Sequence, residues 1–187
     1  MNESESALIQ AVRDVRENHV HGVTLITGDR QERFYSYKQA FDNALMYLHT
    51  LQAHGIRAGD ELVFQLNDDE SEHFIFLFWA CILGGIIAVP VSVGSNAEHK
   101  NKFFKIWDTL QNPYLATSPP VIERLRAHAS DNQQTLHDMD VIADKTVYLE
   151  ALECSPPPTE RFIKVRPVRL PSFSSLPVQR AIQKESL

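Results

Sequence analysis

Residues 76–91 read FLFWACILGGIIAVPV, an apolar helix pattern that passes through two glycines into an apolar strand pattern. The run over 71–83 is too apolar all round for a surface helix, which shows a single apolar stripe, so it predicts a buried helix. The glycine pair at 84–85 falls where a helix end favours a residue that tolerates positive φ. Residues 86–89 then predict a strand buried on both faces of a parallel sheet, ending near Pro90 because proline cannot donate to a ladder.

The composition is ordinary for a soluble globular protein: of 187 residues, 43% are hydrophobic and 22% are charged. A net charge of −6 argues against nucleic acid as a partner, because phosphate binding needs a basic face. The apolar helix run is shorter than the roughly 20 residues of a membrane span, so no membrane partner is expected. The acidic N-terminus lacks the regions of a signal peptide, and Cys81 lies in the apolar run, which suits a reducing compartment. These features predict a cytoplasmic protein.

Helix and strand patterns alternate along the rest of the chain. Ser36 and Gln39 have the spacing of a capping box, and the turn at 28–30 predicts a hairpin between the first two strands. The alternation predicts an α/β fold with a doubly wound, mostly parallel sheet and helices on both faces. The predicted helices lie at 5–17, 71–83, 97–110 and 121–129, with one more between Ser36 and Gly55; the predicted strands lie at 23–27, 33–36, 61–66, 86–89, 114–117, 141–142 and 146–149.

The patterns of regular structure stop near Glu153. Residues 155–160 have the composition of an extended proline-rich linker, and residues 161–187 are basic, proline-bearing and aperiodic. We therefore predict a folded part over 1–152, followed over 153–187 by a linker and a disordered tail.

Motifs for chemistry are weak when each is taken alone. A carboxylate cluster at 68–70 is typical of a solvated helix start, and Trp79 and Trp107 are interpreted as core residues. The glycine pair follows a helix and precedes a strand, the reverse of the order in a phosphate loop. The residues alone predict no catalytic, cofactor-binding or metal-binding side chain. The close histidine pairs, which lack a cysteine or carboxylate partner at ligand spacing and are interpreted as surface residues, are His19 and His21, His49 and His54, and His128 and His137.

Three segments, taken together, resemble the start of the adenylate-forming AMP-binding superfamily. They read YSYKQA at 35–40, GIRAGDELV at 55–63 and FWACILGGIIAVPV at 78–91. Their order and spacing are those of acyl-CoA synthetases, fatty-acyl-AMP ligases and nonribosomal peptide synthetase adenylation domains. The continuation over 92–114 is most similar to the acyl-ligase loading domains of hybrid polyketide–peptide synthases. The resemblance covers about residues 20–152, and implies that 1–152 are the N-terminal portion of an AMP-dependent synthetase/ligase domain with an incomplete sheet.

The resemblance implies that ATP and a carboxylic acid give an acyl-adenylate and pyrophosphate, for loading onto a carrier-protein or CoA thiol. ATP and Mg are implied for the intact enzyme and no cofactor for this fragment, because the family's glycine- and serine-rich phosphate loop, ribose-binding aspartate and catalytic lysine have no counterpart in the chain. We expect the chain to be inactive alone. Its expected partners are the missing C-terminal part and, in the intact enzyme, a carrier protein. Self-association is also expected, because an incomplete sheet leaves 86–89 uncovered.

Two alternatives stay open. The chain could be an assembly module that complements a separately translated remainder of the ligase. It could also be an unrelated nucleotide-binding α/β domain, which would need a glycine loop between a strand and a helix.

The codons of the last segment can also be considered in another reading frame. Residues 168–187 read VRLPSFSSLPVQRAIQKESL, unlike the family's phosphate loop, which is close to SSGSTGxPKG. Synonymous codons can be chosen for these residues that spell QIAFIQFSSGSTGNPKGVI when they are read from the third base of the Val168 codon. This overlap predicts a frameshift near Pro167 that replaced the phosphate loop with an unrelated tail.

Overall fold

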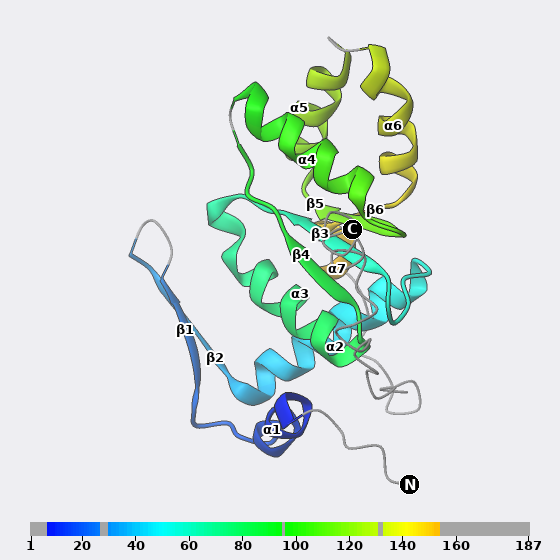
Figure 1. The fold of residues 1–187 in the computed structure, drawn as a ribbon. Helices are drawn as coiled ribbons and strands as arrows, with labels where there is room; N and C mark the ends of the chain where they lie inside the picture. The colour runs from blue at the N-terminus through cyan, green and yellow to red at the C-terminus, as the bar shows by residue number, and fades with distance from the viewer. Residues whose placement is uncertain (1–6, 27–29, 95, 131–132, 154–187) are drawn as a thin grey trace, which may run out of the picture.

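The computed structural model describes residues 7–26, 30–94, 96–130 and 133–153 (Figure 1). Its elements follow the alternation of helices and strands expected from the sequence. In chain order they are α1 (Ala7–Val15), β1 (Gly22–Ile26), β2 (Glu32–Ser36), α2 (Tyr37–Ala53), β3 (Glu61–Gln65), the 3-10 turn η1 (Asp68–Glu70), α3 (Ser71–Gly84), β4 (Ile87–Pro90), α4 (Ala97–Thr109), β5 (Pro113–Thr117), α5 (Pro119–Ser130), α6 (Gln133–Asp144), β6 (Thr146–Tyr148) and α7 (Leu149–Glu153).

The centre of the molecule is a four-stranded sheet in the order β4-β3-β5-β6, and all three neighbouring pairs are parallel. Alternate residues of β3 enter two separate cores: Leu62 and Phe64 pack with α2, α3 and α7, whereas Val63 packs with α4, α5 and α6. Helices therefore cover both faces, and Figure 1 shows α4, α5 and α6 gathered on one side. The predicted doubly wound α/β architecture is confirmed. Strands β1 and β2 form a separate antiparallel ribbon.

The two glycines that follow the apolar helix have different roles. Gly85 ends α3 in the left-handed conformation with φ of 68°, as predicted for a helix end. Gly84 is instead the last helical residue, and a Cβ placed on it would lie 2.4 Å from Cδ1 of Leu48 on α2. Gly84 therefore permits the close approach of α2 and α3.

Two predictions about the central stretch were wrong. Helix α3 is not buried all round, because Phe74 is 39% exposed and Phe78 is only half-buried. Strand β4 is not buried on both faces, because it is an edge strand and Ile87 is 47% exposed. Its predicted end is confirmed, since β4 stops at Pro90, which lies opposite Phe64. An apolar run thus indicated the place of these elements in the chain but not their position at the sheet edge.

The C-terminal half differs from expectation at two elements. Residues 141–142 belong to α6 and not to a strand, because a short apolar pair cannot be told from a buried helix segment by periodicity. Helix α7 was not predicted. The predicted linker and tail, apart from Glu153, lie outside the described residues. Within the described ranges, no helix combines the length and apolar character needed to cross a membrane.

Candidate functional site

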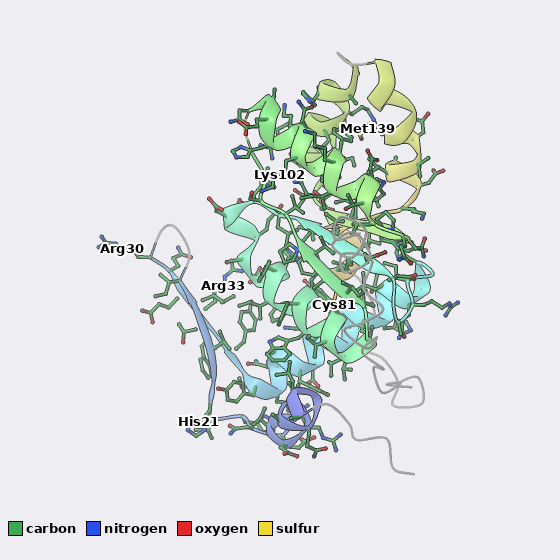
Figure 2. The ribbon with its side chains drawn as sticks, viewed as in Figure 1. His21, Arg30, Arg33, Cys81, Lys102 and Met139 are labelled. Carbon is green, nitrogen blue, oxygen red and sulfur yellow. The ribbon has the colours of Figure 1, made fainter. Side chains whose placement is uncertain are left out.

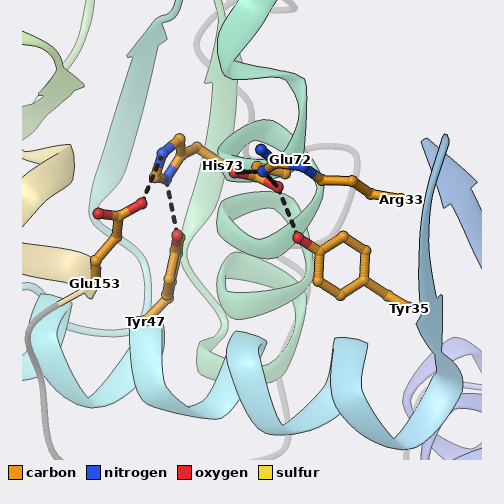
Figure 3. Close-up of polar contacts among 6 residues, drawn as sticks. All are labelled: Arg33, Tyr35, Tyr47, Glu72, His73 and Glu153. Carbon is orange, nitrogen blue, oxygen red and sulfur yellow. Dashed lines mark hydrogen bonds and ion pairs between the residues drawn. The ribbon is translucent and has the colours of Figure 1, made fainter. Parts of the chain in front are cut away.

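Two adjacent side chains at the start of α3, Glu72 and His73, organise a polar cluster that joins several elements (Figure 3). Figure 2 labels one member of the cluster, Arg33, on the β1–β2 ribbon. The turn η1 sets their position: the Asn67 backbone N–H donates to the Glu70 carboxylate at 2.6 Å in a capping box. Consecutive helical residues point about 100° apart. Glu72 therefore faces the β1–β2 ribbon, while His73 faces α2 and α7.

Glu72 anchors the ribbon to α3. Nη1 of Arg33 donates to both carboxylate oxygens at 3.1 and 3.0 Å, and the hydroxyl of Tyr35 donates to Oε2 at 2.7 Å. Arg33 and Tyr35 alternate along β2 and so project from the same face of the strand. Burial by itself would raise the pKa of Glu72, but the hydrogen bonds from Tyr35 and Arg33 and the Arg33 charge outweigh burial and lower that pKa. Glu72 is therefore held as a carboxylate.

His73 connects α3 to α2 and α7. The Tyr47 hydroxyl lies 2.8 Å from Nδ1 of His73, and Nε2 lies 3.4 Å from Oε1 of Glu153. Tyr47 is 3% exposed, and this burial is the main cause that raises the pKa of its hydroxyl. The charges of Glu153 and Glu72 raise that pKa further. A neutral Tyr47 hydroxyl can donate to Nδ1, which leaves the Nε2 proton of His73 facing the Glu153 carboxylate.

This cluster contains the side chains that could hold a metal ion. One ligand atom each from Glu72, His73 and Glu153 lies within 4.8 Å of the others. Among the residues whose side chains are placed, this is the only group of three or more histidine, cysteine, aspartate or glutamate side chains so close together. Cys81 offers no nucleophile, because it is fully buried and burial raises the pKa of its thiol.

The carboxyl edge of the sheet has a second polar group, where β3 and β5 lie side by side but are followed by helices on opposite faces. Such a switch point is where open α/β sheets bind ligands. Here Arg124 Nη2 donates to the Asn67 side-chain oxygen at 2.9 Å, and Asn67 Nδ2 donates to Ser118 Oγ at 3.4 Å. The loops after β3 and β5 contain no glycine. These two loops therefore provide no glycine loop, although Gly94 lies in the loop between β4 and α4.

The residues weighed from the sequence occupy other places. His21 contacts Asn18, and His128 lies 2.9 Å from Asn101, so both bond to local polar groups. Trp107 is buried as predicted, whereas Trp79 is half-buried and lines an apolar cavity of about 290 Å³ beneath α1. The side chain of His137 lies outside the described residues.

His73 and its partners were missed because the partners are distant in sequence. The signal available was a histidine inside an otherwise apolar helix, a residue that needs a buried polar partner. Nothing in the sequence pairs it with Tyr47 or with Glu153, which belongs to a helix that was not predicted.

The fold and its switch point define the class of this protein as a doubly wound α/β domain. No model of a known protein family matches the sequence. Among solved structures, the chain is similar to McyG A-PCP complexed with phenylalanyl-adenylate, with a TM-score of 0.67 and 25% identity over 86% of this chain and 24% of that one.

Two further structures share the fold. The adenylation domain of a keto acid-selecting NRPS module bound to keto acyl adenylate has a TM-score of 0.64 and 24% identity, over 80% of this chain and 27% of that one. The fatty acid AMP ligase from Legionella pneumophila has a TM-score of 0.58 and 19% identity, over 81% of this chain and 26% of that one. The chain thus corresponds to an N-terminal part of a domain of the adenylate-forming superfamily. It spans about a quarter of the length of these solved chains.

Proposed function

We propose that this chain is the N-terminal part of an ATP-dependent ligase that activates a carboxylic acid as its acyl- or aminoacyl-adenylate. In the intact enzyme, the carboxylate and ATP give acyl-AMP and pyrophosphate, and the acyl group is loaded onto a carrier-protein or CoA thiol. The observation that supports this most is the likeness over 86% of the chain to McyG A-PCP complexed with phenylalanyl-adenylate. ATP and Mg belong to the intact enzyme in this proposal.

The chain by itself does not catalyse the reaction. Stabilising the charge that develops during adenylation needs preorganised donors around the phosphates. At the carboxyl edge, Ser118 and Arg124 are both bonded to Asn67, and a single glycine, Gly94, lines the hollow next to Arg124 among the described residues. The donors must therefore come from the remainder of the domain.

Carboxylate-dependent exchange of pyrophosphate into ATP tests the proposal. The purified chain of 187 residues should give no exchange above a heat-killed control with any fatty or amino acid. A continuous protein that joins residues 1–153 to a full adenylation domain remainder in the restored frame should give exchange with one class of acid. Exchange by the 187-residue chain would contradict the proposal that the chain is inactive alone. Absence of exchange by a folded continuous protein would contradict the proposed function.

A second function is an assembly module that pairs with a separately translated remainder. The observation that favours it is the apolar edge of the molecule: Ile87 on the edge strand β4 and Phe74 on α3 are exposed, and none of the described strands pairs with the outer side of β4. Co-expression with the remainder should then yield a stable complex that performs the exchange. Separate purification of the two pieces without association would contradict this function.

The reading frame supports the fragment proposal over an unrelated domain. With suitably chosen synonymous codons, the shifted reading of residues 168–187 gives an apolar strand pattern and SSGSTGNPKG, in the order expected for a strand and its phosphate loop. A match over so many overlapping codons is improbable by chance. We therefore propose that the phosphate loop lies in the shifted frame after Pro167.

A further inference from the structure

We infer that Glu72, His73 and Glu153 form a zinc site that ties α3 to α7, a role separate from adenylation. Their candidate ligand atoms lie within 4.8 Å of one another, and His73 Nε2 is 3.4 Å from Glu153 Oε1. Zinc binds imidazole nitrogen and carboxylate oxygen at about 2.0–2.2 Å, which places two ligands of a tetrahedral ion roughly 3.4 Å apart. The His73–Glu153 pair thus already has the spacing of two zinc ligands.

The charge of the cluster favours a cation. Among the described residues, the guanidinium of Arg33 pairs with Glu72, the imidazole of His73 lies beside Glu153, and the hydroxyls of Tyr35 and Tyr47 are neutral. With a neutral imidazole, these described groups together have one net negative charge. A divalent ion between the two carboxylates and the imidazole offsets this repulsion.

The surrounding groups orient the ligands as the outer shell of a metal site does. Arg33 and Tyr35 fix the Glu72 carboxylate, and Tyr47 contacts the ring nitrogen of His73 that would not bind the metal. When zinc occupies Nε2, the ring proton resides on Nδ1 and donates to the Tyr47 oxygen. The imidazole stays neutral through this change of tautomer, as a metal ligand must.

The donor set favours zinc over magnesium and calcium. One imidazole and two carboxylates suit zinc, whereas magnesium and calcium prefer oxygen ligands alone. Three protein ligands leave a fourth position for water. Solvent can reach that position because the Glu153 side chain is 59% exposed, while His73 is 10% exposed. Zinc at this point would fasten the last described helix to α3 and, through Arg33, to the β1–β2 ribbon.

Isothermal titration of zinc chloride into the EDTA-treated, dialysed 187-residue chain tests the site. We expect the natural chain to bind one zinc ion per chain in a tight-binding phase of the titration. Glu153→Gln should reduce the zinc affinity of that phase more than tenfold, and His73→Gln should abolish the phase. Tyr47→Phe should weaken binding by about tenfold without abolishing it, as outer-shell changes do. The matched control is His128→Gln, a half-buried histidine outside the cluster, which should bind zinc as the natural chain does.

Thermal unfolding separates binding at this site from binding by surface histidines. Zinc should raise the Tm of the natural chain and of His128→Gln, but not that of Glu153→Gln, because only an ion bound to the folded cluster stabilises it. Glu153 is exposed, so its replacement leaves the fold intact. Equal zinc affinity and equal Tm shifts in Glu153→Gln and the natural chain would overturn the site, as would the absence of a tight phase in the natural chain.

Discussion

Single residues in this chain decide how closely its elements approach. Gly84 lies where α3 crosses α2, and its missing side chain leaves room for Leu48 Cδ1, which would be 2.4 Å from a Cβ. The glycine is therefore required for packing rather than for backbone conformation, which Gly85 provides with its φ of 68°. A sequence shows two glycines in a row but not which one faces a neighbouring helix.

Gly84→Val should destabilise the chain by about 1–3 kcal/mol, because a branched side chain overpacks the contact with Leu48. Denaturant unfolding followed by circular dichroism would measure the loss. Adding Leu48→Ala should recover part of it, so that the double variant is more stable than the sum of the two single changes predicts. Strict additivity of the two changes would contradict the contact.

At the scale of elements, the described chain closes its core with α7, a helix of five residues. Leu149 is 4% exposed and Leu152 is fully buried, and both pack in the core formed with α2, α3 and the sheet. The boundary predicted at residue 152 therefore falls inside a helix that packs against the core.

Leu152→Ala should lower the free energy of unfolding by about 2–5 kcal/mol, the usual cost of a cavity at a buried leucine. The exposed neighbour Glu150 supplies the control, and Glu150→Ala should change stability by less than about 0.5 kcal/mol. Urea unfolding of both variants in EDTA measures the difference without any contribution from metal. Equal stability of the two would mean that α7 is not part of the cooperative core.

Local signals predicted most elements of this fold. The capping box of Ser36 and Gln39 is present, and β3 and β5 lie within a residue of their expected ends. These features depend on neighbours a few residues away. The position of a strand within the sheet depends on distant parts of the chain, so apolar runs could not show that β4 lies at the edge. For residues 141–142, an apolar pair could not distinguish a helix from a strand. The cluster around His73 depends on contacts from β2, α2 and α7, and for the same reason it was not predicted.

At the scale of the whole molecule, the covering of the sheet is uneven. Both faces carry helices, but the edge at β4 exposes Ile87, and the neighbouring helix α3 exposes Phe74. The four-stranded sheet is thus covered on its faces, and the apolar surface that this sheet leaves exposed lies at its edge; the β1–β2 ribbon exposes further apolar side chains at Ile26 and Phe34. Edges of this kind promote pairing between chains.

We expect the 187-residue chain to associate in a concentration-dependent way in size-exclusion chromatography with light scattering. Ile87→Lys should shift it toward monomer, because a charge on an edge strand opposes pairing. Val141→Lys serves as the control, since Val141 is 45% exposed on α6, away from the edge. A single monomeric peak with a cooperative thermal transition for the natural chain would contradict the prediction.

We propose that the chain is the beginning of an adenylate-forming ligase whose phosphate loop lies in another reading frame. The nucleotide sequence of its gene from codon 160 onward tests this proposal most directly. We predict that codons 168–187, read from the third base of codon 168, spell QIAFIQFSSGSTGNPKGVI and continue into an open frame for the rest of the ligase. Codons that give any other peptide in that register would contradict the shifted phosphate loop and, with it, the proposed origin of the tail.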